Sequence, residues 1–394
     1  VAADIPLLFG VSMRVVRQLS VCYGIDPAAP AEGVIAFKVF ELACGGTRDR
    51  YARLLELDAL HELGRAARAL QRCSGVVPVL AGLSGPLVGA PALLGGLVDQ
   101  LVLGPEAVAY VAGPRSVATF TGEVTSAEAL GGAAVLSRTN GVAALATESA
   151  DIEAALAELV ALLPDNLDVL PRRRATADPI HRPTPELAGL LPTHPGGSYD
   201  VRDLLRVVVD DDDVLELREG WASNLVTALA RIDGRPVGVV ANQPCSLAGT
   251  LDIAASQKGA RFVAFCDAFN LPIVTVVDTP GFSPGKDLEW RGMIRHGSQL
   301  AFAYARATVP RVSLTLRKSY GGAYIVMDSK TMGNDVAFAW PTAEIAVMGA
   351  RGAAQILHRR ADAEQVAQAE ADYEARHLTP WPACARGLVD AVIS

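Results

Sequence analysis

The chain of 394 residues is 51% hydrophobic and 20% charged, enough apolar sequence to fill large cores in roughly two or three domains. Its formal net charge of −8, without a basic stripe, argues against a nucleic-acid-binding surface. Six scattered cysteines without a CxxC pair, and six histidines without an HExxH motif, predict neither a disulfide framework nor a metal site and fit a reducing cytoplasm.

The first half of the chain alternates predicted helices and strands, a pattern typical of α/β units with mostly buried strands. A loop at residues 26–30, Asp-Pro-Ala-Ala-Pro, separates the first helix from the first strand. The predicted elements are the helix Met13–Ile25, the strand Val34–Leu42, the amphipathic helix Tyr51–Gln71 and a closing helix, Ser149–Leu163.

Residues 74–98 carry no charge over a length that could cross a bilayer. They contain Pro78, Pro86 and Pro91 and several glycines, all of which break a long helix. We therefore predict a buried strand, a turn and a helix start here, and no membrane span. We expect no signal peptide, because the start of the chain lacks a basic segment.

The second half follows a polar stretch rich in proline and arginine, residues 165–195, which has no apolar period and is the predicted linker between domains 1–164 and 196–394. The acidic run Asp210–Asp213 is interpreted as a turn between a helix and a strand, with a cation site as the alternative. The remaining predicted elements are a hairpin of Val214–Leu217 and Asn224–Ile232 ending at Asp233-Gly234, the helices Thr250–Ala260, Ser298–Ala305 and Ala361–Arg376, and the strands Phe262–Phe265, Ile273–Val277 and Val312–Leu316.

An internal repeat links the two halves at a spacing of 232 to 236 residues. Its anchors occur in one order: Cys44 with Asp278, Val77-Pro78 with Val309-Pro310, Gly89-Ala90 with Gly322-Ala323, Asp99 with Asp335, Pro105 with Pro341, and Gly113 with Gly349. We interpret the halves as two copies of one structural unit. The first copy lacks an equivalent of the hairpin, so either it does without one or the natural chain begins earlier.

A glycine turn in the second copy is the predicted active centre. The strand ending near Leu316 leads into Tyr320-Gly321-Gly322-Ala323-Tyr324, and a helix-like run, Ile325–Met332, follows. A strand, a glycine turn and a helix start leave backbone N–H groups unpaired and pointing one way, where the helix dipole adds partial positive charge. Such a turn can hold a developing oxyanion, although a plain packing turn has the same pattern.

Three long stretches carry a resemblance to a known family: residues 230–244 (ARIDGRPVGVVANQP), 278–327 (from DTPGFSPG to RKSYGGAYIVM) and 337–353 (AFAWPTAEIAVMGARGA). They resemble the carboxyltransferase (β) subunit of biotin-dependent acyl-CoA carboxylases, of the acetyl-/propionyl-CoA type. The resemblance is dense from about residue 171 onward and weaker from residue 9 to residue 164. It implies an α/β fold of two tandem crotonase-like domains built from ββα units, in agreement with the repeat.

The resemblance also implies the reaction and the partners. The family transfers CO2 from carboxybiotin, carried on a biotin carboxylase/carboxyl carrier (α) subunit, to the α-carbon of a short acyl-CoA. It works as a homohexamer, with each active site shared between the first half of one protomer and the second half of its dimer mate. Two backbone N–H pairs suit this chemistry because each stabilises charge only as it develops, and no side-chain base or metal is required.

The resemblance assigns roles to particular residues. The pair that faces biotin is Gly322 and Ala323, and the pair that faces the acyl thioester is Gly89 and Ala90. Ile325 corresponds to a position lining the acyl pocket, with plain packing as the alternative. The other expected substrate contacts are Gly45, Gly46, Arg48, Gly281, Phe282, Tyr320 and Gly321.

Three departures from the family fall in the acyl-CoA half. The family has Gly-Gly-Ala where this chain has Gly89-Ala90-Pro91, and proline has no N–H to donate. The family's Ser-Gly-Gly-Ala-Arg is Cys-Gly-Gly-Thr-Arg at residues 44–48. The family segment that precedes Val1 and helps to shape the CoA site is missing from this sequence.

These departures leave three interpretations open. The first is an active carboxyltransferase subunit of primary metabolism or of a secondary-metabolite pathway. The second is a related decarboxylase or transcarboxylase that uses the same enolate chemistry on another acyl carrier. The third is a weakly active paralogue that serves as a structural subunit in a mixed hexamer with another β subunit. The intact second copy favours the first interpretation, and the altered first copy favours the other two.

Overall fold

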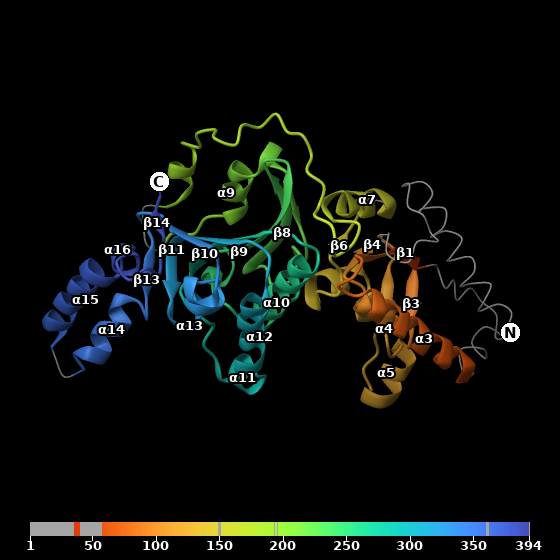
Figure 1. Ribbon diagram of the computed structural model, residues 1–394. Coiled ribbons are helices and arrows are strands. Elements are labelled where there is room, and N and C mark those ends of the chain that lie inside the picture. The colour runs from red at the N-terminus through yellow and green to blue at the C-terminus, as the bar shows by residue number, and fades with distance from the viewer. Residues whose placement is uncertain are drawn as a thin grey trace. The chain divides into compact units, whose positions relative to one another are not determined.

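The computed structural model describes residues 35–39, 57–148, 151–192, 194, 196–359 and 362–393. Contacts divide the chain into two units, each with its own sheet and its own apolar core (Figure 1). The first unit comprises residues 1–172, 218–221 and 268–270, and the second comprises residues 173–217, 222–267 and 271–394.

The first unit is an α/β unit around a parallel sheet in the order β1-β2-β4-β6, with a second parallel pair, β3-β5. Its elements are β1 (Ile35–Val39), α3 (Leu57–Cys73), β2 (Val79–Leu83), β3 (Pro86–Val88), α4 (Ala92–Leu97), β4 (Gln100–Leu103), β5 (Val108–Tyr110), α5 (Pro114–Thr121), α6 (Ala127–Gly131), η1 (Val135–Thr139), β6 (Leu145–Ala146) and α7 (Ile152–Leu162).

Both faces of strand β2 are buried, which explains its unbroken apolar sequence. Alternate residues of β2 join a core that includes Leu70 of α3. Gly82 points the other way, towards α7, where an added Cβ would lie 2.5 Å from Ile152 Cγ2. Glycine at this position therefore lets α7 lie directly on the sheet.

The structure confirms the reading of residues 74–98 as a strand, a turn and a helix start, since β2, β3 and α4 occupy them. In the described ranges, no helix is both long and apolar enough to cross a membrane. The predicted closing helix is α7, whose N-cap Asp151 accepts a hydrogen bond from Ala154 N at 3.0 Å. The predicted helix Met13–Ile25 lies outside the described residues, as do the ends of the predicted strand around β1 and the start of the helix before α3.

The second unit is a mixed sheet in the order β14-β12-β11-β10-β9-β8-β7, with β13 paired to the end of β11. Strands β9 to β12 run parallel, and β8 runs antiparallel to both its neighbours. Its elements are α8 (Leu187–Leu190), α9 (Val201–Val208), η2 (Asp210–Asp212), β7 (Val214–Glu216), β8 (Leu225–Ile232), β9 (Arg235–Asn242), η3 (Leu247–Gly249), α10 (Ile253–Ala268), β10 (Ile273–Thr279), α11 (Lys286–Trp290), α12 (Met293–Arg306), β11 (Arg311–Tyr320), α13 (Gly321–Val326), η4 (Lys330–Met332), β12 (Val336–Ala339), β13 (Glu344–Ala346), α14 (Ala350–Leu357), α15 (Ala363–His377), α16 (Trp381–Cys384) and β14 (Ala391–Val392).

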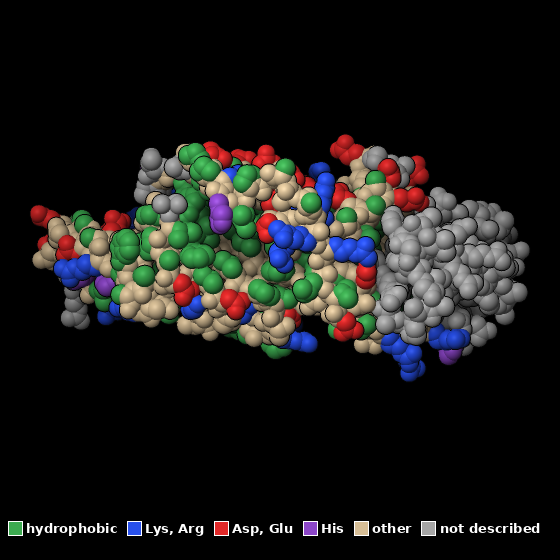
Figure 2. Space-filling model, turned by 45° about the horizontal axis from the view of Figure 1, so that its top comes forward, with side chains coloured by type: hydrophobic (Ala, Val, Ile, Leu, Met, Phe, Trp, Pro, Cys, Tyr) green, Lys and Arg blue, Asp and Glu red, His purple; other side chains and the backbone are tan. Residues whose placement is uncertain are grey.

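Helices cover both faces of this sheet: α9 lies on one face, and α10, α12 and α13 lie on the other (Figure 1). Val201, Leu204 and Leu205 of α9 join β8 and β9 in one buried core. Leu190 of α8 and Trp340 pack partly buried against that core. Apolar side chains gather on this face of the unit (Figure 2).

One predicted strand is wrong. Residues 262–265 belong to α10, which continues from the predicted helix to Ala268. Phe262 and Cys266 lie one helical turn apart and are buried against Gly238 of β9, where an added Cβ would lie 2.4 Å from Cys266 Sγ. The β-favouring composition of this run is overridden because its apolar residues fill the space beneath the sheet.

The predicted hairpin is confirmed: β7 and β8 are antiparallel, and β8 turns into β9 at Asp233-Gly234. The acidic run is the turn before β7, and its first carboxylate, Asp210, accepts hydrogen bonds from Asp233 N at 3.0 Å and Gly234 N at 2.6 Å. Across the described residues, no group of three His, Cys, Asp or Glu side chains could hold a metal ion. The predicted helix near the C-terminus is α15, with a capping box between Asp362 and Gln365.

The two units repeat one plan. Asp99 accepts a hydrogen bond from Val79 N at 2.8 Å in the first unit, and Asp335 accepts one from Arg311 N at 2.7 Å in the second. In each unit a parallel strand pair, β3-β5 or the end of β11 with β13, leads to a glycine turn and a short helix. The structure therefore supports the repeat read from the sequence.

Candidate active site

Strand β11 runs directly into helix α13 at the predicted glycine turn. Tyr320 is extended, and Gly321 has φ +59, a left-handed conformation that glycine adopts without strain. The helix begins at Gly321 and ends at Val326, four residues earlier than the sequence predicted at its start and six earlier at its end. The N–H groups of the first four residues consequently have no partner inside the helix.

The proposed pair, Gly322 and Ala323, lies in this first helical turn. In the described part of the chain, neither amide donates a backbone hydrogen bond outside α13. Gly322 is exposed, whereas Ala323 is 0% exposed. The turn therefore presents Gly322 at the surface, and Ala323 is buried behind it in the same helical turn.

The loop after β10 lies against the glycine turn and brings two more predicted residues to it. An added Cβ on Gly322 would lie 3.3 Å from Phe282 Cε2, and one on Gly297 of α12 would lie 3.2 Å from Cε1 of the same ring. Gly281 has φ +137, and its carbonyl accepts a hydrogen bond from Leu251 N at 3.0 Å. The ring of Phe282 thus forms a wall beside the exposed amide.

The side chains of Tyr320 and Ile325 differ in what they can do. The Tyr320 hydroxyl donates to the Glu344 carboxylate, and burial together with this carboxylate raises the pKa of Tyr320 well above its ordinary value. Its ring lies against Gly349, so this side chain fixes β13 beside β11. Ile325 is about half exposed on α13 and is free to contact a ligand.

A buried charge pair holds the base of the loop, and sequence reasoning missed its role. Asp278, near the end of β10, accepts hydrogen bonds from Arg317 Nε at 2.8 Å and from the Tyr199 hydroxyl at 2.9 Å. Its other oxygen accepts from Lys318 N at 3.2 Å. Burial and Asp278 raise the pKa of Tyr199 above its ordinary value. The signal was present, because Asp278 was a repeat anchor and Arg317 lies in the turn motif.

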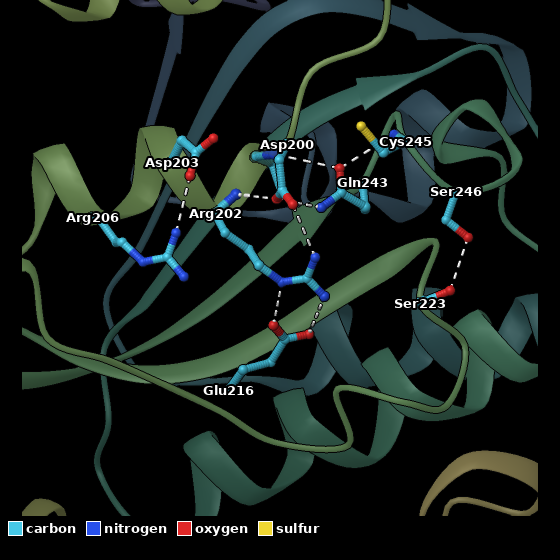
Figure 3. A network of polar contacts seen from close by, with 10 residues as sticks. Asp200, Arg202, Asp203, Arg206, Glu216, Ser223, Gln243, Cys245 and Ser246 are labelled. Carbon is cyan, nitrogen blue, oxygen red and sulfur yellow. Dashed lines mark hydrogen bonds and ion pairs between the residues drawn. The ribbon is translucent and has the colours of Figure 1, made fainter.

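A second polar network fixes the segment after β9 (Figure 3). Arg202 donates to Glu216 at 2.6 Å, and Gln243 Nε2 donates to Asp200 at 2.6 Å. Gln243 Oε1 accepts from Cys245 N at 3.2 Å. Two non-glycine residues with positive φ, Leu247 and Ala248, follow this network. The chain then reaches Leu251, whose N–H donates to Gly281 O in the loop that carries Phe282.

The first unit offers a different turn. The Gly89 N–H donates to Tyr110 O at 2.9 Å, and Pro91 has no N–H, so Ala90 holds the one amide of this turn without a backbone hydrogen bond among the described residues. Gly89 has φ +75 and follows β3 as Gly321 follows β11, so these two glycines correspond, one residue away from the pairing read from the sequence. The remaining predicted contacts, Gly45, Gly46 and Arg48, lie outside the described residues.

The model of the carboxyl transferase domain family matches residues 39–394, and that of the EcsC protein family matches residues 1–72. The first match includes residues 39–164, most of the region, residues 9–164, where the sequence resemblance was expected to be weaker.

Among the relatives, the propionyl-CoA carboxylase beta chain of Roseobacter denitrificans is 45% identical over 349 residues, covering 87% of this chain and 68% of that protein. The methylmalonyl-CoA decarboxylase subunit alpha of Veillonella parvula is 40% identical over 352 residues, covering 89% and 68%. A crystal structure of the transcarboxylase 12S hexamer, with methylmalonyl-coenzyme A and methylmalonic acid bound, has a TM-score of 0.84 and 41% identity, covering 86% and 66%.

The chain thus spans about two thirds of the length of these relatives. The predicted resemblance to carboxyltransferase subunits of acyl-CoA carboxylases is confirmed, and so is the predicted α/β, crotonase-like fold. The family model covers most of the sequence, including the glycine turn and both of its supporting networks. The chain belongs to the carboxyl transferase domain family.

Proposed function

We propose that this chain is the carboxyltransferase component of an acyl-CoA carboxylase, acting on carboxybiotin carried by a partner subunit and on a short acyl-CoA. The observation that carries the proposal is the turn from β11 into α13, where the exposed Gly322 lies beside Phe282 in the first helical turn. In this function, residues 1–164 and 196–394 would be the two domains, joined by residues 165–195, and the protein would act in the cytoplasm.

The biotin side is proposed to lie on the second unit. Carboxybiotin supplies CO2 and, once CO2 has left, the base that takes the α-proton of the thioester. The amides of Gly322 and Ala323 would stabilise negative charge on the ureido oxygen, and the partial charge of the helix N-terminus adds to this. The turn fits such a group because glycine leaves the amide uncovered, whereas a side chain at Gly322 would press on Phe282.

The acyl side is proposed to lie on the first unit, at Gly89 and Ala90, with Gly45, Gly46 and Arg48 as further contacts. The free Ala90 amide would stabilise the enolate oxygen of the thioester. Ile325 is proposed to line the acyl pocket, and an apolar side chain there suits a short acyl chain. Gly281, Phe282, Tyr320 and Gly321 complete the proposed set on the biotin side.

Matching exposed apolar residues support assembly with further copies. Leu93, Val111 and Phe120 of the first unit correspond by the repeat to Ile325, Val347 and Ile356 of the second. Their exposed fractions are 60%, 60% and 89% in the first unit and 46%, 73% and 64% in the second. Exposed apolar groups that recur at corresponding positions of both units support an interface. We infer a hexamer, or a mixed hexamer with another β subunit, in which each site is completed by a dimer mate.

One observation favours a second candidate function, a related decarboxylase or transcarboxylase acting on another acyl carrier. The acyl-side turn has one free amide where the biotin-side turn has two unpaired ones. One lost donor weakens stabilisation of an enolate by a few kcal/mol, about 10²–10³-fold in rate. If the lost donor removes most of the activity, the chain would instead serve as a weakly active structural subunit.

The test combines the protein with a biotinylated carrier subunit, ATP, bicarbonate and acetyl-, propionyl- or butyryl-CoA. Formation of a malonyl-type product with any of these thioesters supports the carboxylase. Loss of CO2 from a malonyl thioester without biotin supports the decarboxylase instead. Inertness in both assays, with co-purification of an active β subunit, supports the structural subunit.

A further inference from the structure

A buried ion pair joins the two ends of the segment that carries the glycine turn. Arg311, the first residue of β11, donates through Nη1 to Asp328 Oδ1, two residues beyond the end of α13. Arg311 is 3% exposed and Asp328 is 0% exposed. Arg311 Nη2 also donates to Met332 O at 3.1 Å. The ion pair therefore links the segment that follows α13 to the first residue of β11.

The surroundings make this connection rigid. Asn334 Nδ2 donates to Asp328 O at 2.7 Å and to Ser313 Oγ at 2.8 Å. The Arg311 guanidinium lies over the ring of Tyr304 on α12, 5.9 Å from its centroid. Asp328 itself has φ +55, an unfavourable backbone conformation for a residue with a side chain. Strain of this kind persists only where neighbouring contacts hold the residue in place.

The repeat provides an internal control for the ion pair. The backbone contact of Asp335 with Arg311 has its counterpart in Asp99 with Val79, so the strand ladder is built in the same way in both units. The positions that correspond to Arg311 and Asp328 are, however, Val79 and Gly96. The ion pair is thus dispensable for building the unit, and it occurs beside the turn with two unpaired amides.

Stability does not explain this pair. Removing two charges from water costs as much as their attraction returns, so buried ion pairs often contribute little net stability. Burial raises the pKa of Asp328 to about 6, although Arg311 lowers it. Arg311 and the Thr275 side chain offset only part of the cost of burying this carboxylate. The pair therefore costs free energy that another benefit offsets.

We propose that the Arg311–Asp328 pair is a positioning device for α13, which keeps the amides of Gly322 and Ala323 aimed at the ureido oxygen. This inference rests on the proposed function, in which those amides hold the charge. The pair acts through the helix and touches no substrate. The charged and titratable groups that face Asp328 are Arg311 of β11, Asp335 after η4 and Tyr304 of α12.

The test compares Asp328→Asn with the wild type in the assembled protein, by hydrogen–deuterium exchange of the α13 amides and by steady-state transfer. We expect exchange in residues 321–326 to rise about tenfold. We expect kcat to fall about tenfold while KM for the acyl-CoA stays within about twofold, because a misaimed donor weakens the transition state. Arg311→Lys keeps the positive charge, so its exchange rate and its kcat should lie between those of the wild type and those of Asp328→Asn.

The matched control is Asp390→Asn, which removes an exposed ion pair with Lys330 in the same part of the fold. It should change neither exchange nor kcat. Should Asp328→Asn fail to fold, Arg311→Lys provides the second measurement: exchange in residues 321–326 should rise above that of the wild type, while exchange in β9 stays unchanged.

An unchanged α13 exchange rate, or a looser α13 with unchanged transfer, overturns the proposal. The exchange measurement needs no turnover. A protein that transfers no CO2 but shows the predicted change in exchange therefore contradicts the proposed function and leaves the positioning role of the ion pair intact. An active protein whose α13 exchange is unchanged by Asp328→Asn contradicts the positioning role alone.

Discussion

Single residues decide the chemistry of each turn. Gly322 is exposed and admits the ring of Phe282, while Pro91 removes an N–H from the turn of the first unit. The sequence showed both residue types. It could not show that the Gly89 N–H is used by Tyr110 O, because that contact is made by a strand pair that forms only on folding.

Replacing Gly322 with valine tests the exposed amide. The branched side chain must displace Phe282 and cover the N–H, so we expect kcat to fall about 10²–10³-fold with the oligomer intact. Steady-state transfer and light scattering measure the two quantities. Gly64→Ala is the matched control, because nothing lies within 4 Å of a Cβ there. Unchanged turnover in Gly322→Val would refute the role of this amide.

Ile325→Asp tests the acyl pocket. A carboxylate on this half-exposed position disfavours apolar acyl chains, so the ratio of kcat/KM for butyryl-CoA to that for acetyl-CoA should fall. The change should be at least about tenfold, since burying a charge beside an alkyl chain is costly. Ile294→Asp, on an exposed face of α12, is the control. An unchanged ratio would show that Ile325 serves packing alone.

The pKa of Asp328 predicts a pH dependence of stability. Its folded value, about 6, lies above the ordinary value of 3.8, so the folded state binds this proton more tightly than the unfolded state. The carboxyl group therefore favours folding least above pH 6, and its contribution grows as the pH falls towards 4. The free energy of unfolding of the wild type, minus that of Asp328→Asn, should increase by on the order of 2–3 kcal/mol from pH 6 to pH 4. Urea unfolding at each pH measures this difference. A difference that is flat with pH contradicts the prediction.

At the scale of elements, apolar runs located most strands, and they failed where packing overrides composition. Residues 262–265 have a β-favouring composition, yet they extend α10 because Phe262 and Cys266 pack against Gly238 of strand β9. The start of α13 was placed too late because its first residues are glycines, which helix propensity disfavours. Asp278 and Arg317 were not paired in advance, because strands β10 and β11 bring them together from distant positions.

Gly238→Val tests the packing of α10 on β9. A side chain here would overlap Cys266 Sγ, so we expect a loss of about 1–3 kcal/mol in the free energy of unfolding, seen in the urea midpoint. The double variant Gly238→Val/Cys266→Ala should recover part of the loss by making room. A double variant as unstable as the sum of both changes would place the cause elsewhere.

At the scale of the whole molecule, the duplication was readable from the sequence because its anchors are turn residues and strand ends. The corresponding exposed apolar residues of the two units could not be identified from the sequence, since exposure depends on which face each short helix presents. Their correspondence is the structural reason for expecting further copies of the chain, or of a related β subunit, to complete each site.

Val347→Asp tests this interface. A charge in the middle of a buried apolar contact should dissociate the assembly to smaller species and reduce transfer by at least about tenfold. Mass photometry measures the species. Ile180→Asp, at another exposed apolar position, in residues 165–195, should leave both the mass and the transfer rate unchanged. A Val347→Asp variant that keeps the wild-type mass would move the interface to another surface.

The most direct test follows the carboxyl group itself. A carrier subunit is carboxylated with isotopically labelled bicarbonate, freed of ATP, and mixed in a single turnover with this protein and propionyl-CoA. The account predicts label in the carboxylated thioester, at a rate that Gly322→Val lowers. Label that remains on the carrier, or leaves as CO2 without entering the thioester, when an established β subunit accepts it from the same carrier, would contradict it.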